Sequence, residues 1–252
     1  MPVCGFARWL YFGFQNCKMK ASIIIPYVDL VPEEVEMGIW RSAETARVRH
    51  EVEILFEHDP DRTGPACTRN RALRKATGEI VLFTDADCLV PSDWVISLCD
   101  WLEKHPEVDG ASGRLLPGKN TWVAAVERWK DRVLGICYDK ETIGGREMNV
   151  GFTNNCAYRR SALLRVGGFD ETFKLPCGED VDLKNRICAS GGKVAFIFVS
   201  VIHRQSYNWD YLRKRIYQQA LNRKEGRFPT LSLLWLLPIN FFNTMKKVTH
   251  YR

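Results

Sequence analysis

Residues 80–88 of this 252-residue chain read Ile-Val-Leu-Phe-Thr-Asp-Ala-Asp-Cys, an apolar run followed by two aspartates. Four apolar side chains in succession, without polar alternation, are typical of a strand that is buried on both faces of a parallel sheet. Asp85 and Asp87 would then lie at the carboxyl end of this strand, where open α/β sheets bind their ligands. The stretch therefore predicts a parallel sheet with an acidic site at its edge.

Further apolar runs flank this strand, and segments with helical patterns and caps separate them. Strands that alternate with helices predict an α/β fold of the Rossmann-like kind, with a mostly parallel central sheet flanked by helices. The predicted strands are 22–26, 53–56, 80–84, 152–160 and 194–201, and the predicted helices are 32–49, 67–76, 91–105, 122–134, 161–166 and 180–190.

The composition is that of a water-soluble globular protein, with 46% hydrophobic and 26% charged residues. It excludes an intrinsically disordered, collagen-like or coiled-coil chain. The 36 Lys and Arg residues exceed the 30 Asp and Glu residues by 36 − 30 = 6 charges. This excess is too small to indicate nucleic-acid binding by itself, and we expect no nucleic-acid partner.

The nine cysteines are an odd, scattered set that contains no Cys-x-x-Cys pair. A disulfide framework favours even counts in short chains, so we expect reduced thiols and a cytoplasmic location. No two Cys or His residues lie at the spacing of a zinc-ligand motif, and we therefore expect no zinc site.

The chain divides into an N-terminal extension (1–20), a central α/β domain (21–205) and a C-terminal tail (206–252). The extension is either non-structural or a short membrane-surface anchor. In the tail, Arg and Lys alternate with Tyr and Trp before an apolar stretch of about a dozen residues, which is shorter than a bilayer span. Such a basic and apolar helical tail could lie on an anionic membrane, contact a diphosphate or an anionic acceptor, or stay solvated. The first alternative would make the protein peripheral at the inner face of the cell membrane.

The Asp85-Ala86-Asp87 tripeptide is the candidate metal site. Side chains alternate along a strand, so both carboxylates could point to one side, where they repel unless a cation lies between them. Oxygen ligands in a partly open site suit Mg²⁺ or Mn²⁺, which often bridge carboxylates to phosphates. The alternative is a solvated loop after a strand.

A second acidic cluster, Glu179-Asp180-Val181-Asp182, follows Gly178 at the start of a predicted helix. Acidic residues commonly cap a helix N-terminus. Three acids exceed what a cap requires, however, and a carboxylate near a hydroxyl nucleophile can act as a general base. The cluster is therefore the candidate catalytic site.

Four stretches follow one another along the chain: SIIIP (22–26), TRNRALRKATGEIVLFTDADC (68–88), NNCAYRRSALLRVGGFDETF (154–173) and GEDVDLKNR (178–186). Their order resembles glycosyltransferase family 2, whose members have the GT-A fold. The resemblance covers about residues 21–205 and depends on the succession of stretches more than on any one of them.

The resemblance implies an inverting transfer of a sugar from a nucleotide-diphosphate sugar to the hydroxyl of a saccharide or lipid-linked acceptor, as in cell envelope polysaccharide biosynthesis. It assigns Mg²⁺ or Mn²⁺ to Asp85 and Asp87 with His203, and the role of general base to Asp180 with Glu179 beside it. The implied nucleotide-sugar-binding residues are Pro26, Tyr27, Glu57, Asp59, Asn70, Asp85 and Asn155.

One departure from the family concerns the nucleoside. Family members usually carry a VVDDGSTD-like stretch after the second strand, whereas this chain has ILFEHDPDRTG at 54–64. Either Glu57 or Asp59 could take the place of the nucleoside-binding aspartate, so the base stays open among uridine, guanosine and thymidine.

Three other functions are alternatives. The first is a catalytically degenerate GT-A-like protein that only binds a sugar or a partner. The second is a sugar nucleotidyltransferase, which should carry a Gly-rich, Lys-bearing phosphate loop after its first strand; residues 26–32 have neither feature. The third is a glycosidase, which would use paired carboxylates without a metal or a nucleotide.

Overall fold

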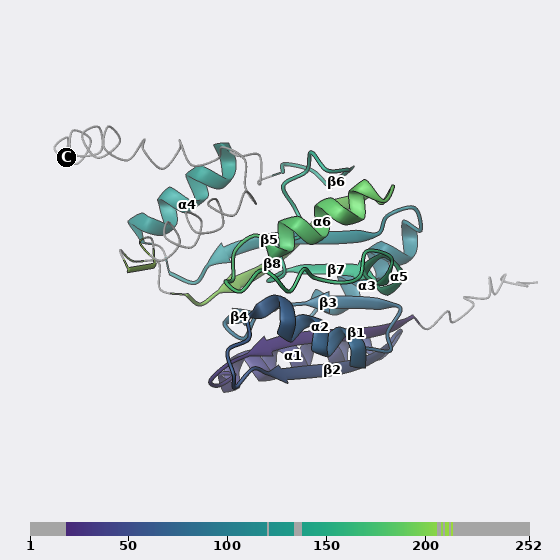
Figure 1. The fold of residues 1–252 in the computed structure, drawn as a ribbon, viewed down its shortest axis with the longest axis horizontal. Helices are drawn as coiled ribbons and strands as arrows, with labels where there is room; N and C mark the ends of the chain where they lie inside the picture. Colours follow the sequence, from purple (N-terminus) through teal and green to yellow (C-terminus); the bar gives the residue numbers. More distant parts are fainter. Residues whose placement is uncertain are drawn as a thin grey trace, which may run out of the picture.

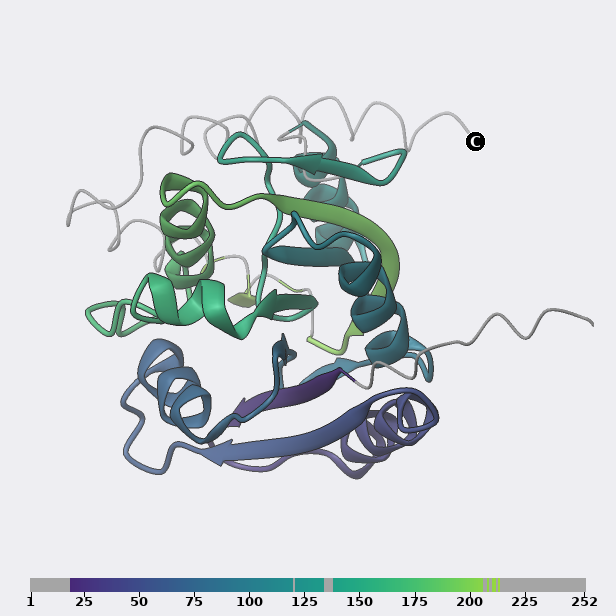
Figure 2. The ribbon, with the colours of Figure 1, turned by 90° about the vertical axis from the view of Figure 1, so that its right-hand side faces the viewer.

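The computed structural model describes residues 19–205, except 120 and 134–137, together with 208, 210, 211 and 213. Within these residues one eight-stranded sheet carries helices on both of its faces (Figures 1 and 2). The strands are β1 (Lys20–Tyr27), β2 (Glu51–His58), β3 (Ile80–Phe83), β4 (Cys88–Leu89), β5 (Gly110–Pro117), β6 (Thr142–Gly144), β7 (Cys156–Arg159) and β8 (Val194–His203). The helices are α1 (Glu33–Ala46), α2 (Pro65–Lys75), α3 (Trp94–Lys104), α4 (Trp122–Val133), α5 (Arg160–Arg165) and α6 (Glu179–Ala189).

The strand order is β2-β1-β3-β7-β5-β8-β4, and β6 pairs with β8 off this path. Strand β1 is parallel to both β2 and β3. Strand β7 is antiparallel to β3 and to β5, and β5 is parallel to β8. Five strands (β1, β2, β3, β5 and β8) therefore point in one direction, which confirms the predicted α/β fold with a mostly parallel sheet.

Both faces of the sheet are buried at the central strands β1 and β3, which explains the uninterrupted apolar runs of these strands. In β1, Ile23 and Ile25 pack in the core beneath α1 and α3, whereas Ile24 packs on the opposite side beneath α2, α5 and α6. Burying one such side chain contributes roughly 1.5–3 kcal/mol. Figure 2 shows the two helical layers on either side of the strands.

Several predicted boundaries are wrong, for local reasons. The first helix ends at Ala46 instead of residue 49 because the chain turns there. The second begins at Pro65, which suits a first helical position because its missing N–H would have no intrahelical partner. The predicted strand 152–160 shrinks to β7 because the N–H of Asn155 closes a turn on the carbonyl of Phe152.

Strand β5 occupies a segment that has no regular apolar pattern. Its pairing with β7 and β8 stabilises it, and the register with β8 shifts between Ser112 and Arg114. A Cβ atom at the intervening Gly113 would lie 1.9 Å from the Val199 carbonyl oxygen, so only glycine fits this close approach.

The two ends of the chain were predicted to be an extension and a tail. Apart from Met19, Lys20, 208, 210, 211 and 213, both segments lie outside the described residues, as does the predicted membrane contact. No helix in the part of the chain that the structure describes combines the length and apolar character needed to cross a bilayer.

Candidate active site

The candidate site lies at the edge of the sheet where β1, β2 and β3 end. These strands are parallel and end at Tyr27, His58 and Phe83, so the loops that follow them lie at the same edge. The predicted residues Pro26, Tyr27, Asp59 and Asp85 come from this edge.

A single guanidinium group joins the two acidic clusters. Arg69 of α2 is 3% exposed, and it donates hydrogen bonds to Asp85 Oδ1 at 2.8 Å and to Glu179 Oε1 at 2.9 Å. Such charge-assisted bonds are about twice as strong as neutral ones. Arg69 therefore connects the loop after β3 to the first turn of α6, although 110 residues separate it from Glu179.

Glu179 and Asp180 differ in their surroundings. Burial, and then the charge of Asp180, raise the pKa of Glu179 to about 7 against the opposing effect of Arg69. Asp180 is half-buried at the start of α6, and its Oδ1 accepts a hydrogen bond from the Val181 N–H at 2.8 Å. Glu179 is thus the buried partner of Arg69, and Asp180 is the more accessible acid.

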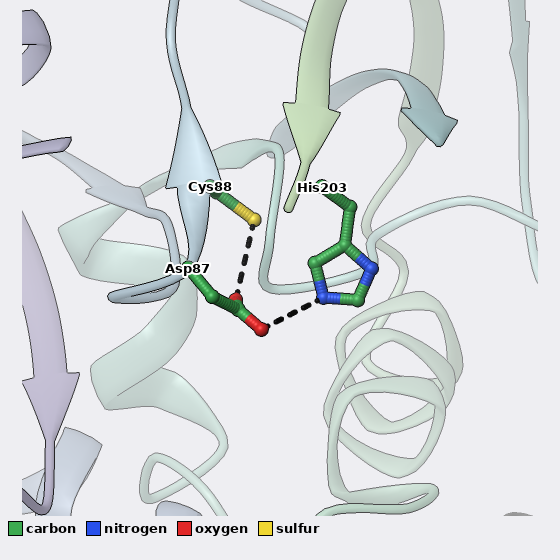
Figure 3. Close-up of side chains that lie close together, drawn as sticks. All are labelled: Asp87, Cys88 and His203. Atoms are coloured by element: carbon green, nitrogen blue, oxygen red, sulfur yellow. Dashed lines mark hydrogen bonds and ion pairs between the residues drawn. The ribbon is translucent and has the colours of Figure 1, made fainter. Parts of the chain in front are cut away.

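Asp87 faces His203 and Cys88 (Figure 3). Its Oδ2 lies 3.1 Å from His203 Nε2, and its Oδ1 accepts a hydrogen bond from Cys88 Sγ at 3.8 Å. Burial raises the pKa of Asp87, but the hydrogen bond and charge of His203 outweigh it and hold this pKa below its usual value. Burial also raises the pKa of the Cys88 thiol, which is therefore neutral in the metal-free protein.

Asp85 and Asp87 have different hydrogen-bond partners, Arg69 and His203, and the strand alternation on which their shared orientation was expected does not apply to them. Strand β3 ends at Phe83, and the two aspartates lie in the turn that follows it, so strand alternation does not govern them. Among the described residues, the metal-ligating atoms that lie within 4.8 Å of one another at this edge belong to Asp87, Cys88 and His203, without Asp85.

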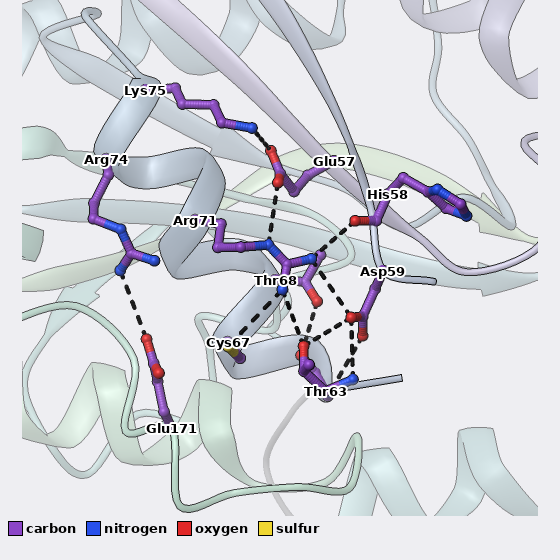
Figure 4. Close-up of polar contacts among 11 residues, drawn as sticks. Glu57, His58, Asp59, Thr63, Cys67, Thr68, Arg71, Arg74, Lys75 and Glu171 are labelled. Carbon is purple, nitrogen blue, oxygen red and sulfur yellow. Dashed lines mark hydrogen bonds and ion pairs between the residues drawn. The ribbon is translucent and has the colours of Figure 1, made fainter. Parts of the chain in front are cut away.

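The acids at the end of β2, Glu57 within the strand and Asp59 just after it, have internal partners (Figure 4). Asp59 accepts hydrogen bonds from the backbone and hydroxyl of Thr63 and from the Gly64 N–H. Burial raises the pKa of Asp59, but these bonds outweigh it and lower the pKa to about 2. Glu57 lies 3.2 Å from Arg71 Nε and 2.6 Å from Lys75 Nζ.

Tyr27 is fixed at the same edge by an aromatic contact. Its ring stacks on His58 with a centroid separation of 4.9 Å and an interplanar angle of 18°. His58 Nε2 in turn lies 2.8 Å from the Val28 carbonyl oxygen. The loop after β1 and the end of β2 thus present one ordered aromatic surface.

Asn70, predicted to bind the donor, connects α2 to the loop after α5. Its Nδ2 donates to the Phe169 carbonyl at 2.8 Å and to Glu171 Oε1 at 2.9 Å, and its Oδ1 accepts from the Phe169 N–H at 2.8 Å. The preceding Gly168 has φ = 75°, a conformation that favours glycine. The side-chain amide of Asn70 therefore forms its hydrogen bonds with groups of the protein itself.

Asn155, also predicted to bind the donor, lies in the interior at 1% exposure. Its Nδ2 donates to the carbonyls of Arg114 and Val199 at 2.9 and 3.0 Å, and its Oδ1 accepts from Trp94 Nε1 at 2.9 Å. These three bonds join β5, β8 and α3 around the start of β7. All three of these partners of Asn155 belong to the protein interior.

Arg69 was not among the predicted site residues, although a sequence pattern identifies it. It lies three residues after Ala66 and four before Leu73, both of which are buried in the core beneath α2. A charged residue on the apolar face of a helix requires a buried partner of opposite charge. The pattern indicates that such a partner exists, but it does not identify Glu179.

A protein family and several known proteins resemble this chain. A family model described as Glycosyl transferase family 2 matches residues 42–167, which is half of the chain. The pre-mycofactocin glycosyltransferase of Mycobacterium tuberculosis is 31% identical over 185 residues, covering 66% of this chain and 36% of that protein. The succinoglycan biosynthesis protein ExoM of Rhizobium meliloti is 27% identical over 179 residues, covering 67% of this chain and 54% of that protein. The chain thus spans about a third to a half of the length of these relatives.

The fold also matches solved structures. The mannosyltransferase PcManGT from Pyrobaculum calidifontis, solved in complex with GDP-Man and Mn²⁺, superposes with a TM-score of 0.59 at 21% identity. The match covers 84% of this chain and 66% of that one. The sheet, the family model and the sequence relatives agree: this chain belongs to glycosyl transferase family 2 and has its GT-A fold.

Proposed function

We propose that this protein is an inverting glycosyltransferase, which moves a sugar from a nucleotide-diphosphate sugar to a hydroxyl of a saccharide or lipid-linked acceptor. One observation carries the proposal: Arg69 binds Asp85 and Glu179 at the same time. This bridge sets the acids after β3 opposite the first turn of α6. A sugar between them would have a diphosphate-binding side and a proton-accepting side.

The donor side comprises Asp87, His203 and Asp85. A carboxylate oxygen and an imidazole nitrogen 3.1 Å apart fit a divalent cation such as Mn²⁺ or Mg²⁺. When bound, the cation would offset the charge that develops on the leaving nucleoside diphosphate. Arg69 holds Oδ1 of Asp85, so we assign the other oxygen to the donor or its cation. The Mn²⁺ and GDP-Man named for the Pyrobaculum calidifontis structure support this assignment.

The nucleoside would lie against the loop after β1. The stacked Tyr27 and His58 rings offer an aromatic surface there. Asp59 and Glu57 are bound by internal partners, so we assign them to holding this loop and α2. An aromatic surface can stack against any nucleobase, so this contact does not identify the nucleobase of the donor.

The acceptor side is Asp180. We assign it as the general base that takes the proton of the acceptor hydroxyl as its oxygen attacks the anomeric carbon. The bond from that carbon to the diphosphate oxygen breaks on the opposite face, so the configuration inverts. General-base catalysis contributes about 10²–10⁴-fold. Glu179, buried against Arg69, would position the first turn of α6.

The matched pair Asp180→Asn and Asp182→Asn tests this assignment. Both acids lie in the first turn of α6. Asp182 forms an ion pair at 2.7 Å with Arg186, which lies one turn further along the helix, so Asp182 serves as the control. Release of nucleoside diphosphate from a panel of nucleotide sugars is measured with Mn²⁺ or Mg²⁺, and donor binding by thermal shift. We expect Asp180→Asn to lose about 10²–10⁴-fold in turnover while it still binds donor. Asp182→Asn should change turnover by only a few-fold.

Three outcomes would contradict the proposal. If no nucleotide sugar stabilises the wild-type protein or is turned over by it, the transferase function is wrong. Turnover that survives EDTA would exclude the metal. A product whose anomeric configuration, read by NMR, matches that of the donor would exclude inversion.

A further inference from the structure

We propose that Asp87, Cys88 and His203 form a single site for a borderline divalent transition metal of the Zn²⁺ or Co²⁺ class, with Cys88 as a sulfur ligand. The inference deepens the proposed function and rests on it only for Asp87 and His203 as ligands. The assignment of Cys88, and of the softer class of metal, is additional.

The pairing of β4 with β8 creates this site. Cys88 lies directly opposite His203 in an antiparallel pair. Directly opposed residues have their side chains on the same face, with Cβ atoms about 4.5–5.5 Å apart. The site thus arises from two residues that are 115 positions apart, which explains why no zinc-type spacing occurs in the sequence.

Asp87 completes the set from the turn before β4. Its carboxylate lies between the other two groups, with one oxygen 3.1 Å from His203 Nε2 and the other 3.8 Å from Cys88 Sγ (Figure 3). Ligands 2.0–2.3 Å from a tetrahedral ion are separated by about 3.3–3.8 Å. One ligand atom from each of the three residues lies within 4.8 Å of the other two, so the side chains would close by up to about 1 Å on a bound ion.

The three side chains differ in exposure, and the site is open to solvent at Asp87. Cys88 is 0% and His203 is 9% exposed, whereas 47% of the Asp87 side chain is exposed. Three protein ligands and one open position are the arrangement of catalytic metal sites. The exposed Asp87 carboxylate marks the open side, where we place the donor phosphates.

The sulfur ligand from Cys88 determines which metal ions the site prefers. As the metal–sulfur bond forms, the thiol proton leaves to solvent. Zn²⁺ and Co²⁺ bind thiolate well, whereas Mg²⁺ prefers oxygen ligands. The chain should therefore bind Zn²⁺ and Co²⁺ more tightly than a site made of Asp87 and His203 alone.

The test uses the full chain, purified free of metal in a phosphine reductant, and titrated with Co²⁺. A cobalt–thiolate bond produces charge-transfer absorption in the near ultraviolet, which oxygen and nitrogen ligands do not. The other metal-type cluster among the described residues (His50, Asp100 and Glu103) contains no sulfur and cannot produce this band. We expect the band at one Co²⁺ per chain.

Cys88→Ser should abolish the band, and Cys99→Ser should retain it. Cys99 is the matched control because it is 0% exposed in the same hydrophobic core as Cys88 but lies on α3, outside the cluster. Cys88→Ala serves as a second variant, and circular dichroism melts confirm that each variant is folded. Competition titrations should show Zn²⁺ affinity reduced at least about 10-fold in Cys88→Ser, with a smaller change for Mn²⁺.

A band that persists in folded Cys88→Ser and Cys88→Ala would overturn the proposal. The proposal would also be overturned if the wild-type protein bound Co²⁺ without producing the band and His203→Ala abolished this binding. Turnover of a nucleotide sugar with Mn²⁺, measured separately, distinguishes the two proposals. Turnover without the band refutes the sulfur ligand alone, and the band without turnover refutes the transferase function alone.

Discussion

Replacing Arg69 by Met isolates the charge that joins the two acidic clusters. Met keeps much of the side-chain volume beside the Phe169 ring, which lies 5.7 Å from the guanidinium carbon, but it cannot donate to Asp85 or Glu179. Removing one partner of a buried ion pair costs about 3–5 kcal/mol because the remaining group must either stay charged in the interior or be neutralised. Glu179 is fully buried, whereas 30% of the Asp85 side chain is exposed, so we expect the lower end, about 3 kcal/mol.

Urea unfolding at pH 7, followed by circular dichroism, measures this loss. In a thermal melt, 3 kcal/mol corresponds to a decrease of about 6–12 °C for a chain of this size. Arg74→Met is the control on the same helix, because the Arg74 side chain is 64% exposed and lies 3.7 Å from Glu171. An exposed pair of this kind contributes at most about 1 kcal/mol.

The pH dependence gives a second check. Below about pH 7, Glu179 of the wild-type protein becomes protonated and its attraction to Arg69 weakens. The destabilisation caused by Arg69→Met should therefore shrink between pH 7.5 and pH 5.5. Equal stability of Arg69→Met and Arg74→Met at pH 7 would refute this account of Arg69.

Three further predictions concern buried polar groups. Because the pKa of Glu179 is raised from 4.5 to about 7 in the folded state, stability should fall by on the order of 3 kcal/mol as pH rises through this interval, and Glu179→Gln should remove this decline in unfolding titrations. The pKa of Asp59 is lowered from 3.8 to about 2, so Asp59→Asn should cost at most about 2 kcal/mol at pH 7 and progressively less as pH falls from 3.8 through about 2; a cost that is independent of pH would contradict this. Asn155→Ala leaves the Trp94 N–H and two carbonyls without partners and should cost about 3 kcal/mol or more in thermal unfolding, whereas reduced donor affinity at native stability would restore its predicted binding role.

Local patterns in the sequence predicted the scaffold. The run 80–83 is apolar because β3 is buried on both faces, and the acidic cluster 179–182 begins a helix because its charges favour the N-terminal end of the helix dipole. Both effects act within a few residues of the chain. Strand β5 follows no such pattern because its partners β7 and β8 stabilise it, so the sequence did not predict it.

The individual contacts of the site depend on the tertiary structure. The alternation rule predicted that Asp85 and Asp87 share one side, but β3 ends before them, and each side chain takes the partner that the fold brings near. Asn155 was predicted to bind the donor, and the fold gives its side chain three hydrogen-bond partners in the protein interior that the sequence did not indicate.

The sequence alone thus determined the α/β sheet, its carboxyl edge and the acids that gather there, because burial and helix capping are local properties of the chain. Only the tertiary structure decided that Arg69 joins Asp85 to Glu179 and that Cys88 lies opposite His203. These partners are far apart in the sequence, and the crossovers and strand pairing that bring them together leave no periodic pattern in it.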